Sequence, residues 1–347
     1  MVIIINELFA TPKEWKKVIL RSIRAALLEH GSATKVELSQ KLGVSFPTIS
    51  KFLTQMEKDG ELILVGLDHS SGGRRANRYA YNPEFMLGLA IFLEKTETNY
   101  TIFNCLGEEK EQGSTSSVLM DDALSLSHLL ESIIEKHPKI SSVAIGVPGS
   151  VNNGRIIFIP SYEQFHDFDL KGYFEERLSI PVVVENDMNA AVLGYYDNRI
   201  NKDKGSLVYL YLGQNGPGAG IMINGDVVRG STFFSGEISF VPQYDDRNFV
   251  QALNNEDGTE TALVHDEKKI DAISRLVASF TATINPHTII FSNDEINKQI
   301  TDQITLRSAA YIPKEHLPEL TVSDWKQDYL YGLQKLGLGL MISGTKK

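Results

Sequence analysis

Glu185, Asn186 and Asp187 are side chains whose types and spacing could do chemistry. They follow the apolar run 181–184, which is typical of a buried strand. Ligands of α/β sheets bind at the carboxyl ends of strands. An amide beside a carboxylate also suits hydroxyl groups, because each hydroxyl both donates and accepts a hydrogen bond. The segment therefore predicts a ligand site. The alternative is that these side chains only cap the helix expected over 188–198.

A second group of polar side chains lies near the amino terminus, where residues 36–58 predict two short helices joined by a tight turn. Leu38 and Leu42 lie four residues apart, on one face of the first helix, and Gly43 has the backbone freedom to end it. This layout is typical of a helix-turn-helix, whose second helix enters the major groove of DNA. The side chains that we expect to face DNA are Ser45, Pro47, Thr48, Ser50 and Lys51.

Residues 61–82 predict two strands around a glycine- and arginine-rich turn. In that turn Gly73, Arg74 and Arg75 suit a flexible arm that enters the minor groove, where arginine favours the negative potential. With a further helix expected over 12–30, the hairpin completes a winged helix-turn-helix over residues 1–82. Double-stranded DNA is then the expected partner. The alternative is a small helical module that binds another protein.

The charge of the chain is distributed unevenly. The 347 residues carry a net charge of −10, which would argue against nucleic acid if it were spread evenly. Residues 1–82, however, hold 12 basic and 8 acidic side chains, whereas the remainder holds 22 and 36. The basic excess therefore coincides with the expected DNA-binding segment. The single cysteine excludes an intrachain disulfide, and no apolar run reaches membrane length, so we expect a cytoplasmic protein with no membrane partner.

From residue 87 onward the pattern changes to short strands that alternate with helices, which is typical of the α/β class. Residues 142–149 predict a buried strand that ends in a glycine turn. Residues 206–212 predict another strand, followed by a glycine-rich turn over 213–220, and a terminal helix is expected over 324–342.

In this order and spacing the motifs resemble the ROK family of repressors, open reading frames and kinases, and within it the winged-helix repressors of sugar metabolism. The segments that carry the resemblance are the helix-turn-helix, the glycine-arginine wing, and residues 145–149, 185–191, 218–221 and 236–238. The resemblance implies an actin-like, hexokinase-like (ribonuclease H-like) body of two lobes with a cleft. We expect one lobe over 83–203 and 327–347, and the other over 204–326. It also implies a homodimer or a dimer of dimers.

The resemblance also implies roles for individual residues. In the family's kinases, the aspartate that matches Asp187 is the general base, which takes the proton of a sugar hydroxyl as that oxygen attacks ATP. Asn186 and Glu237 match residues that hydrogen-bond the sugar, and Ser161 stands where an asparagine is usual. We therefore expect Asn186, Asp187, Glu237 and Ser161 to contact a ligand in the cleft.

The departures from the family pattern predict that kinase activity is lost. Family kinases carry an Asp-x-Gly-Gly-Thr phosphate loop at the first strand, where this chain has Ala90 and Phe92. A glycine pair that follows a later strand is replaced by Ser292 and Asn293. We accordingly expect no catalytic residue.

The family's zinc site needs a histidine and a cysteine cluster. Here Phe240 stands at the histidine position, and no cysteine follows Cys105. We accordingly expect no metal and no other cofactor.

The sequence thus predicts a transcriptional regulator of carbohydrate metabolism, acting as a repressor. A sugar or sugar phosphate in the cleft would shift the angle between the lobes, and with it the spacing of two DNA-binding helices in a dimer. Two alternatives stay open at this point. One is an ATP-dependent sugar kinase with an accessory DNA-binding domain. The other is a ligand-free architectural regulator whose body only dimerises.

Overall fold

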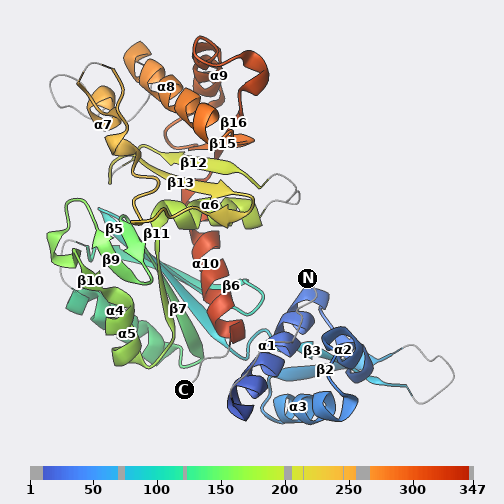
Figure 1. Ribbon diagram of the computed structural model, residues 1–347. Helices are drawn as coiled ribbons and strands as arrows, with labels where there is room; N and C mark the ends of the chain where they lie inside the picture. Colours follow the sequence, from blue (N-terminus) through green and yellow to red (C-terminus); the bar gives the residue numbers. More distant parts are fainter. Residues whose placement is uncertain are drawn as a thin grey trace.

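The protein is described by a computed structural model that covers residues 11–68, 75–119, 123–198, 205–213, 215–244, 246–254 and 266–343. Figure 1 shows an amino-terminal module set to one side of a body that contains two large sheets. The structure confirms the α/β class and the two-lobed body. The prediction for residues 73 and 74 falls outside the described residues.

The amino-terminal module is made of three helices and a small antiparallel sheet with the strand order β1-β3-β2. Thr34 begins the second helix with a capping box, because its side chain accepts from the Glu37 N–H while the Glu37 carboxylate accepts from the Thr34 N–H. Ile23, Leu38, Ile49 and Leu53 fill the core and are almost fully buried. The elements are α1 (Pro12–His30), β1 (Ala33–Thr34), α2 (Lys35–Leu42), α3 (Phe46–Lys58), β2 (Leu62–Leu67) and β3 (Asn77–Tyr81).

The first lobe of the body is a five-stranded sheet with the order β11-β7-β4-β5-β6. Strands β11, β7 and β4 run parallel, and β5 and β6 add antiparallel to the edge. A small sheet β10-β9-β8 follows β7. The strands are β4 (Leu87–Leu93), β5 (Glu97–Asn104), β6 (Glu109–Ser116), β7 (Ile140–Val147), β8 (Ser150–Asn152), β9 (Arg155–Phe158), β10 (Phe168–Asp169) and β11 (Val182–Asn186), and the helices are α4 (Ala123–Lys136) and α5 (Leu170–Leu178).

The two faces of β4 pack against different layers because successive side chains of a strand point to opposite sides. Leu89 and Ile91 belong to the apolar cluster that α4 and α5 cover. Ala90 and Phe92 belong to the other cluster, together with the terminal helix. The central strand of this lobe is therefore buried on both sides.

The second lobe is a five-stranded sheet with the order β14-β13-β12-β15-β16. Its outer face is covered by α8 and α9, which lie above the sheet in Figure 1. The strands are β12 (Leu207–Tyr211), β13 (Gly218–Ile223), β14 (Asp226–Val227), β15 (Thr288–Ser292) and β16 (Glu319–Ser323), and the helices are α7 (Phe249–Leu253), α8 (Glu267–Thr283) and α9 (Lys298–Ser308).

Two helices, α6 (Asp187–Asp197) and α10 (Trp325–Ser343), pack against each other between the lobes. Helix α10 contacts β4, β7 and β11 of the first lobe, and α6 contacts β12 and β13 of the second. Glycines let the two backbones approach closely. A Cβ on Gly194 would lie 1.9 Å from the Asp328 carbonyl oxygen, and a Cβ on Gly332 would lie 1.9 Å from that of Ala190.

Within the described ranges, no helix is both long enough and apolar enough to cross a lipid bilayer. The boundaries that the sequence predicts between the module and the two lobes stay predictions.

We predict that Gly332→Ala lowers the free energy of unfolding by about 1–3 kcal/mol, because the new methyl group must push the α6 and α10 backbones apart. Gly339→Ala is the matched control on the same helix, since no atom lies within 4 Å of the added Cβ. It should leave stability unchanged or raise it by up to about 1 kcal/mol through helix propensity. Urea denaturation measures both, and equal stabilities of the two variants would contradict the packing argument.

Candidate nucleic-acid interface and ligand cleft

The first candidate site is built on α2 and α3. Gly43 adopts the left-handed conformation (φ 64°) and ends α2. The Ser45 hydroxyl caps α3 by accepting from the Thr48 N–H, and it lies 2.8 Å from the Thr48 hydroxyl. Ile49, Leu53 and Met56 are buried and hold α3 in the module. The second helix of the pair is therefore fixed, with its first turn at the surface.

The structure separates the predicted DNA-contacting residues into two groups. Ser45, Pro47 and Lys51 are exposed. Arg75, at which the described chain resumes after the turn, is exposed as well. Thr48 is half-buried. Ser50 is also half-buried, and its hydroxyl accepts from Lys35 Nζ at 3.1 Å. Sequence periodicity did not indicate this bond, because Lys35 lies fifteen residues away, on α2.

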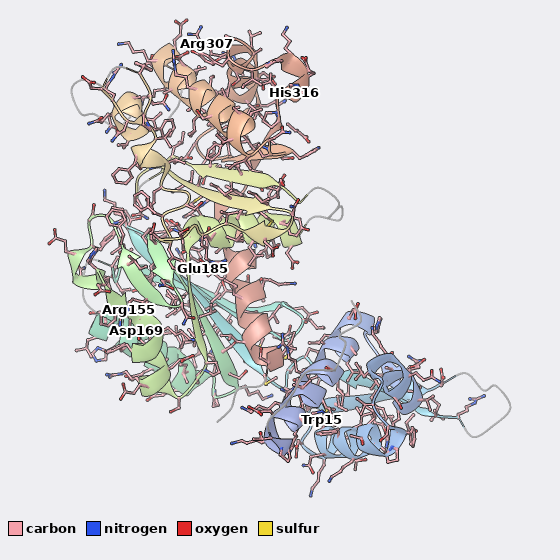
Figure 2. The ribbon with its side chains drawn as sticks, viewed as in Figure 1. Trp15, Arg155, Asp169, Glu185, Arg307 and His316 are labelled. Carbon is pink, nitrogen blue, oxygen red and sulfur yellow. The ribbon has the colours of Figure 1, made fainter. Side chains whose placement is uncertain are left out.

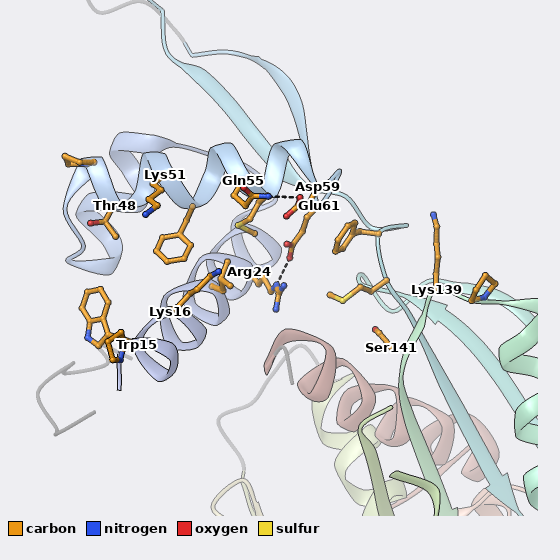
Figure 3. Close-up of a pocket in the computed structure, with 18 residues that line it drawn as sticks. Trp15, Lys16, Arg24, Thr48, Lys51, Gln55, Asp59, Glu61, Lys139 and Ser141 are labelled. Carbon is orange, nitrogen blue, oxygen red and sulfur yellow. Dashed lines mark hydrogen bonds and ion pairs between the residues drawn. The ribbon is translucent and has the colours of Figure 1, made fainter. Parts of the chain in front are cut away.

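A groove of about 1120 Å³ runs between α1, α3 and the first lobe (Figure 3). Leu20, Phe52 and Met56 supply apolar surface along it. Near the body the Arg24 guanidinium pairs with the Glu61 carboxylate, and this ion pair is largely buried. The Tyr81 hydroxyl also donates to that carboxylate, at 3.0 Å. This buried network fixes α1 against the hairpin at the end of the module nearest the body.

The second candidate site is the cleft at the carboxyl ends of β7 and β11, where the second lobe faces the first. Its cavity measures only about 40 Å³. That is room for a few waters and far below the roughly 300–1,000 Å³ of a typical ligand pocket. The lobes are therefore close together in this structure. The side chains and turns that line the cavity include Asn186, Asp187, Tyr211, Asn215, Glu237 and the turn at Gly216–Gly218.

Asn186 and Asp187 sit where β11 ends and α6 begins. The Asn186 side chain caps α6, because its Oδ1 accepts from the Asn189 N–H at 2.9 Å. Its Nδ2 donates to the Gly149 carbonyl and to Asp187 Oδ1. Asp187 Oδ1 also accepts from the Met188 N–H at 2.7 Å. The capping alternative is thus realised for Asn186, and the same two residues line the cleft.

Two carboxyl groups of the cleft are hard to ionise. The pKa of Asp187 is raised to about 7, chiefly by burial and in smaller part by the charge of Glu237, while the hydrogen bond from the Met188 N–H opposes the shift. Burial also raises the pKa of Glu237, and the Ser150 hydroxyl, which donates to Glu237 Oε1 at 3.0 Å, opposes that shift. Both groups can therefore change protonation with the local environment.

Three contacts join the lobes around the cleft. Ser150 of the first lobe donates to Glu237 of the second. The Tyr162 hydroxyl donates to Asn215 Oδ1 at 3.1 Å. Glu185, at the centre of the body in Figure 2, forms an ion pair with Arg229, which follows β14.

Sequence reasoning missed Ser150, Tyr162, Asn215 and Arg229 as cleft-closing residues. Their partners lie 44 to 87 residues away in sequence, so no local pattern signals the pairing.

The predicted ligand residue Ser161 is not brought into the cleft. It is exposed, with a φ of 67°, and the neighbouring Pro160 lines the cavity instead. Phe165 is 2% exposed and belongs to the core of the first lobe. The cleft therefore brings together Asn186, Asp187 and Glu237. Ser161 does not line the cavity, and its role in binding a ligand stays a prediction.

The sequence positions at which the phosphate loop of a family kinase is expected carry apolar side chains that lie in the core. Ala90 and Phe92 are buried in β4. The Phe92 ring packs against Tyr329, and the Trp325 ring packs against Tyr329 and stacks on Tyr211, with 4.2 Å between the stacked ring centres. Glu94 is buried beside this row, close enough for its charge to raise the pKa of Asp187. Aromatic rings and a carboxyl group are a poor environment for a polyphosphate.

Within the described ranges, no group of three or more histidine, cysteine or acidic side chains could hold a metal ion. Phe240, at the family's histidine position, packs against Phe234 and Phe158. Phe240 thus belongs to a group of three neighbouring aromatic rings.

Comparison with known proteins identifies the body. Residues 90–246, which run from β4 past the cleft, match the model of the ROK family. This chain contains a ROK-family domain. Asn186, Asp187 and Glu237 all lie inside the matched range, so the residues that line the cleft are part of the ROK domain.

The xylose repressor of Bacillus spizizenii is 26% identical over 64% of this chain and 60% of its own length. The chain thus matches about three fifths of that curated relative. A beta-glucoside kinase of Listeria monocytogenes is 32% identical, over 31% of this chain and 37% of its own length.

Among solved structures, a ROK-family transcriptional regulator that is a homologue of the Escherichia coli MLC protein matches with a TM-score of 0.70. The match has 17% identity and covers 95% of this chain and 99% of that one. A ROK glucokinase of Streptomyces griseus matches with a TM-score of 0.54 and 18% identity, over 72% of this chain and 99% of its own. At these identities the structures establish the fold of the ROK domain.

We predict that Asp187→Asn makes the protein more stable than wild type at pH 8, and that the difference disappears near pH 4. The folded-state pKa of Asp187 lies above its ordinary value of 3.8. The folded state therefore holds a proton that the unfolded state releases as the pH rises from 4 to 7, and wild type loses stability over that window. The asparagine keeps the Oδ1 acceptor and has no proton to lose.

The expected difference is a few kcal/mol at most, at about 1.4 kcal/mol per unit of pKa shift. Urea denaturation from pH 4 to 8 measures it, with the exposed carboxylate variant Asp226→Asn as control. Parallel curves for wild type and Asp187→Asn would show that Asp187 is ionised normally in the folded protein.

Proposed function

We propose that this chain is a DNA-binding transcriptional repressor whose ROK body senses a sugar and does not phosphorylate it. The observation that carries the proposal is the combination in one chain of two features. One is a helix pair in which the start of α3 lies at the surface, with Ser45, Pro47 and Lys51 exposed. The other is a sugar-kinase fold whose phosphate side is occupied by aromatic rings and a buried carboxyl group.

The amino-terminal module acts as a winged helix-turn-helix in this proposal. Helix α3 is the reading helix, and the β2–β3 hairpin is the wing, with Gly73, Arg74 and Arg75 in the turn. Ser45, Pro47, Thr48 and Lys51 meet the major groove, and Ser50 does so once the Lys35 side chain releases it. The similarity to xylose repressors over about three fifths of their length supports the role of a repressor for the chain.

The cleft binds the effector through Asn186, Asp187 and Glu237. The buried carboxyl group of Asp187 and the half-buried one of Glu237 face the cavity, and among the described residues that line it no lysine, arginine or histidine offsets them. A phosphate group would find no cation there to offset the cost of burying its charge. Hydroxyl groups would find both donors and acceptors. Of the two effector classes left open by the sequence, we therefore propose an unphosphorylated sugar.

Binding must open the cleft, because its present cavity is too small for a sugar. The Ser150–Glu237 and Tyr162–Asn215 bonds and the Glu185–Arg229 ion pair then rearrange. The ligand shifts the population of lobe arrangements to the extent that it prefers one of them. In a homodimer this changes the spacing of two α3 helices on a palindromic operator.

An active sugar kinase is the second candidate, and it is favoured by the position of Asp187 at the cleft. A coupled assay of ATP turnover over a panel of sugars separates the two. A repressor without kinase activity should show no sugar-dependent turnover of ATP. Turnover that occurs in wild type and disappears in Asp187→Asn would instead identify the protein as a sugar kinase.

We predict that Thr48→Ala combined with Lys51→Ala weakens operator binding at least tenfold, because each good base contact contributes about 1–3 kcal/mol. The operator is first selected from a random DNA pool with the wild-type chain, and affinity is then measured by fluorescence anisotropy. Lys314→Ala, an exposed lysine of the second lobe, is the control and should bind like wild type. Wild-type affinity in the double variant would contradict the assignment of α3 as the reading helix.

We predict that at least one unphosphorylated sugar raises the melting temperature, whereas the matching sugar phosphates do not. Asp187→Asn combined with Glu237→Gln should abolish the rise, because each change replaces one carboxyl oxygen of the cleft by an amide NH2 donor while keeping side-chain size. Differential scanning fluorimetry over paired sugars and sugar phosphates measures this. If none of the sugars or sugar phosphates raises the melting temperature, the result would favour the ligand-free architectural regulator.

A further inference from the structure

Three lysines gather in the first half of α1. Lys13, Lys16 and Lys17 are exposed and form no ion pair with any described residue. Elsewhere the exposed cations of the body are commonly paired, as Lys110 is with Glu84 and Lys136 with Glu111. With Glu14 as the one acidic side chain among residues 12–17, the cluster presents a net positive charge to solvent.

Lys16 lines the groove beside α3, and helical spacing places Lys13 and Lys17 next to it on α1. Residues three and four apart share a face of a helix, so Lys13, Lys16 and Lys17 continue the face that carries Leu20 and Arg24. Lys16, Leu20 and Arg24 all line the groove. Figure 3 shows Lys16 on α1 and Lys51 on α3 along the same groove, with Trp15 at its open end.

The charge and the position together indicate the partner. Lys51 belongs to the helix that we propose reads DNA, and Lys16 lines the same groove from the opposite helix. A duplex held against the first turn of α3 would bring its flanking phosphates toward the first turns of α1. Lysine binds phosphate as a point charge without reading the base sequence.

We propose that Lys13, Lys16 and Lys17 of α1 form a second DNA contact, which binds the phosphate backbone beside the segment read by α3. This inference rests on the proposed DNA-binding function and adds a surface to it. The contact positions the module and contributes affinity, and the choice of sequence stays with α3 and the wing.

The test uses the full-length chain and the triple variant Lys13→Gln, Lys16→Gln, Lys17→Gln. Each phosphate contact adds about 0.9 to the slope of log Kd against log salt concentration. The variant should therefore lower that slope by about 2–3 on a random-sequence duplex of about 40 base pairs. The ratio of operator affinity to random-duplex affinity should stay close to that of wild type.

The control triple variant is Lys95→Gln, Lys268→Gln, Lys314→Gln, which removes the same charge from exposed positions of the body. It should keep the wild-type slope, and circular dichroism should show both variants folded. An unchanged slope in the α1 variant, or an equal loss in the control, would overturn the inference and leave the proposed function standing. Failure of the wild-type chain to bind any duplex would overturn the proposed function as well.

Discussion

The close crossing of α6 and α10 is the contact on which the rest of the body depends. Gly194 and Gly332 leave no side chain at the crossing, so each backbone packs directly on the other. Helix α10 covers the sheet of the first lobe, and α6 covers the sheet of the second, so this one crossing sets the distance between the lobes. Helix α6 also begins with Asp187, at the floor of the cleft. The geometry of the candidate ligand site therefore follows from the packing of two helices.

The apolar cluster at this crossing extends into the amino-terminal module. It contains Ala190 and Leu333 of the helix pair together with Ile23 and Leu53 of the module, and α1 contacts α10 directly. Packed side chains transmit displacement because interiors are dense. A change in the angle between the lobes therefore has a continuous apolar route to the helices proposed to bind DNA. The buried Arg24–Glu61 pair stiffens α1 against the hairpin next to that route.

The cleft and the phosphate side of the body differ in what they can hold, although they lie on one scaffold. The cleft keeps an amide and two carboxyl groups that suit hydroxyls. Beyond it, the rings of Tyr211, Trp325, Tyr329 and Phe92 form a packed row that runs from the cleft to β4. Such a row stabilises the closed body by burying aromatic surface. The two regions thus differ in polarity, because the cleft offers hydrogen-bonding groups and the row offers apolar surface.

The sequence by itself determined the local elements. The spacing of Ile49, Leu53 and Met56, the cap at Ser45 and the glycine at position 43 act over a few residues, so they predict α3 and the turn before it correctly. The apolar run before Asn186 likewise predicts a strand. The family resemblance added the ROK body and the positions of Asn186, Asp187 and Glu237, since the order of the motifs along the chain carries that information.

Only the tertiary structure decided which side chains meet. Ser150 bonds to Glu237, Tyr162 to Asn215, and Lys16 lies along the same groove as Lys51, although each pair is separated by 35 to 87 residues. It also placed Ser161 outside the cleft and engaged Ser50 with Lys35. The physical reason is that hydrophobic periodicity and capping are local, whereas closure of the cleft and desolvation of its carboxyl groups depend on how two distant sheets and a helix crossing are packed together.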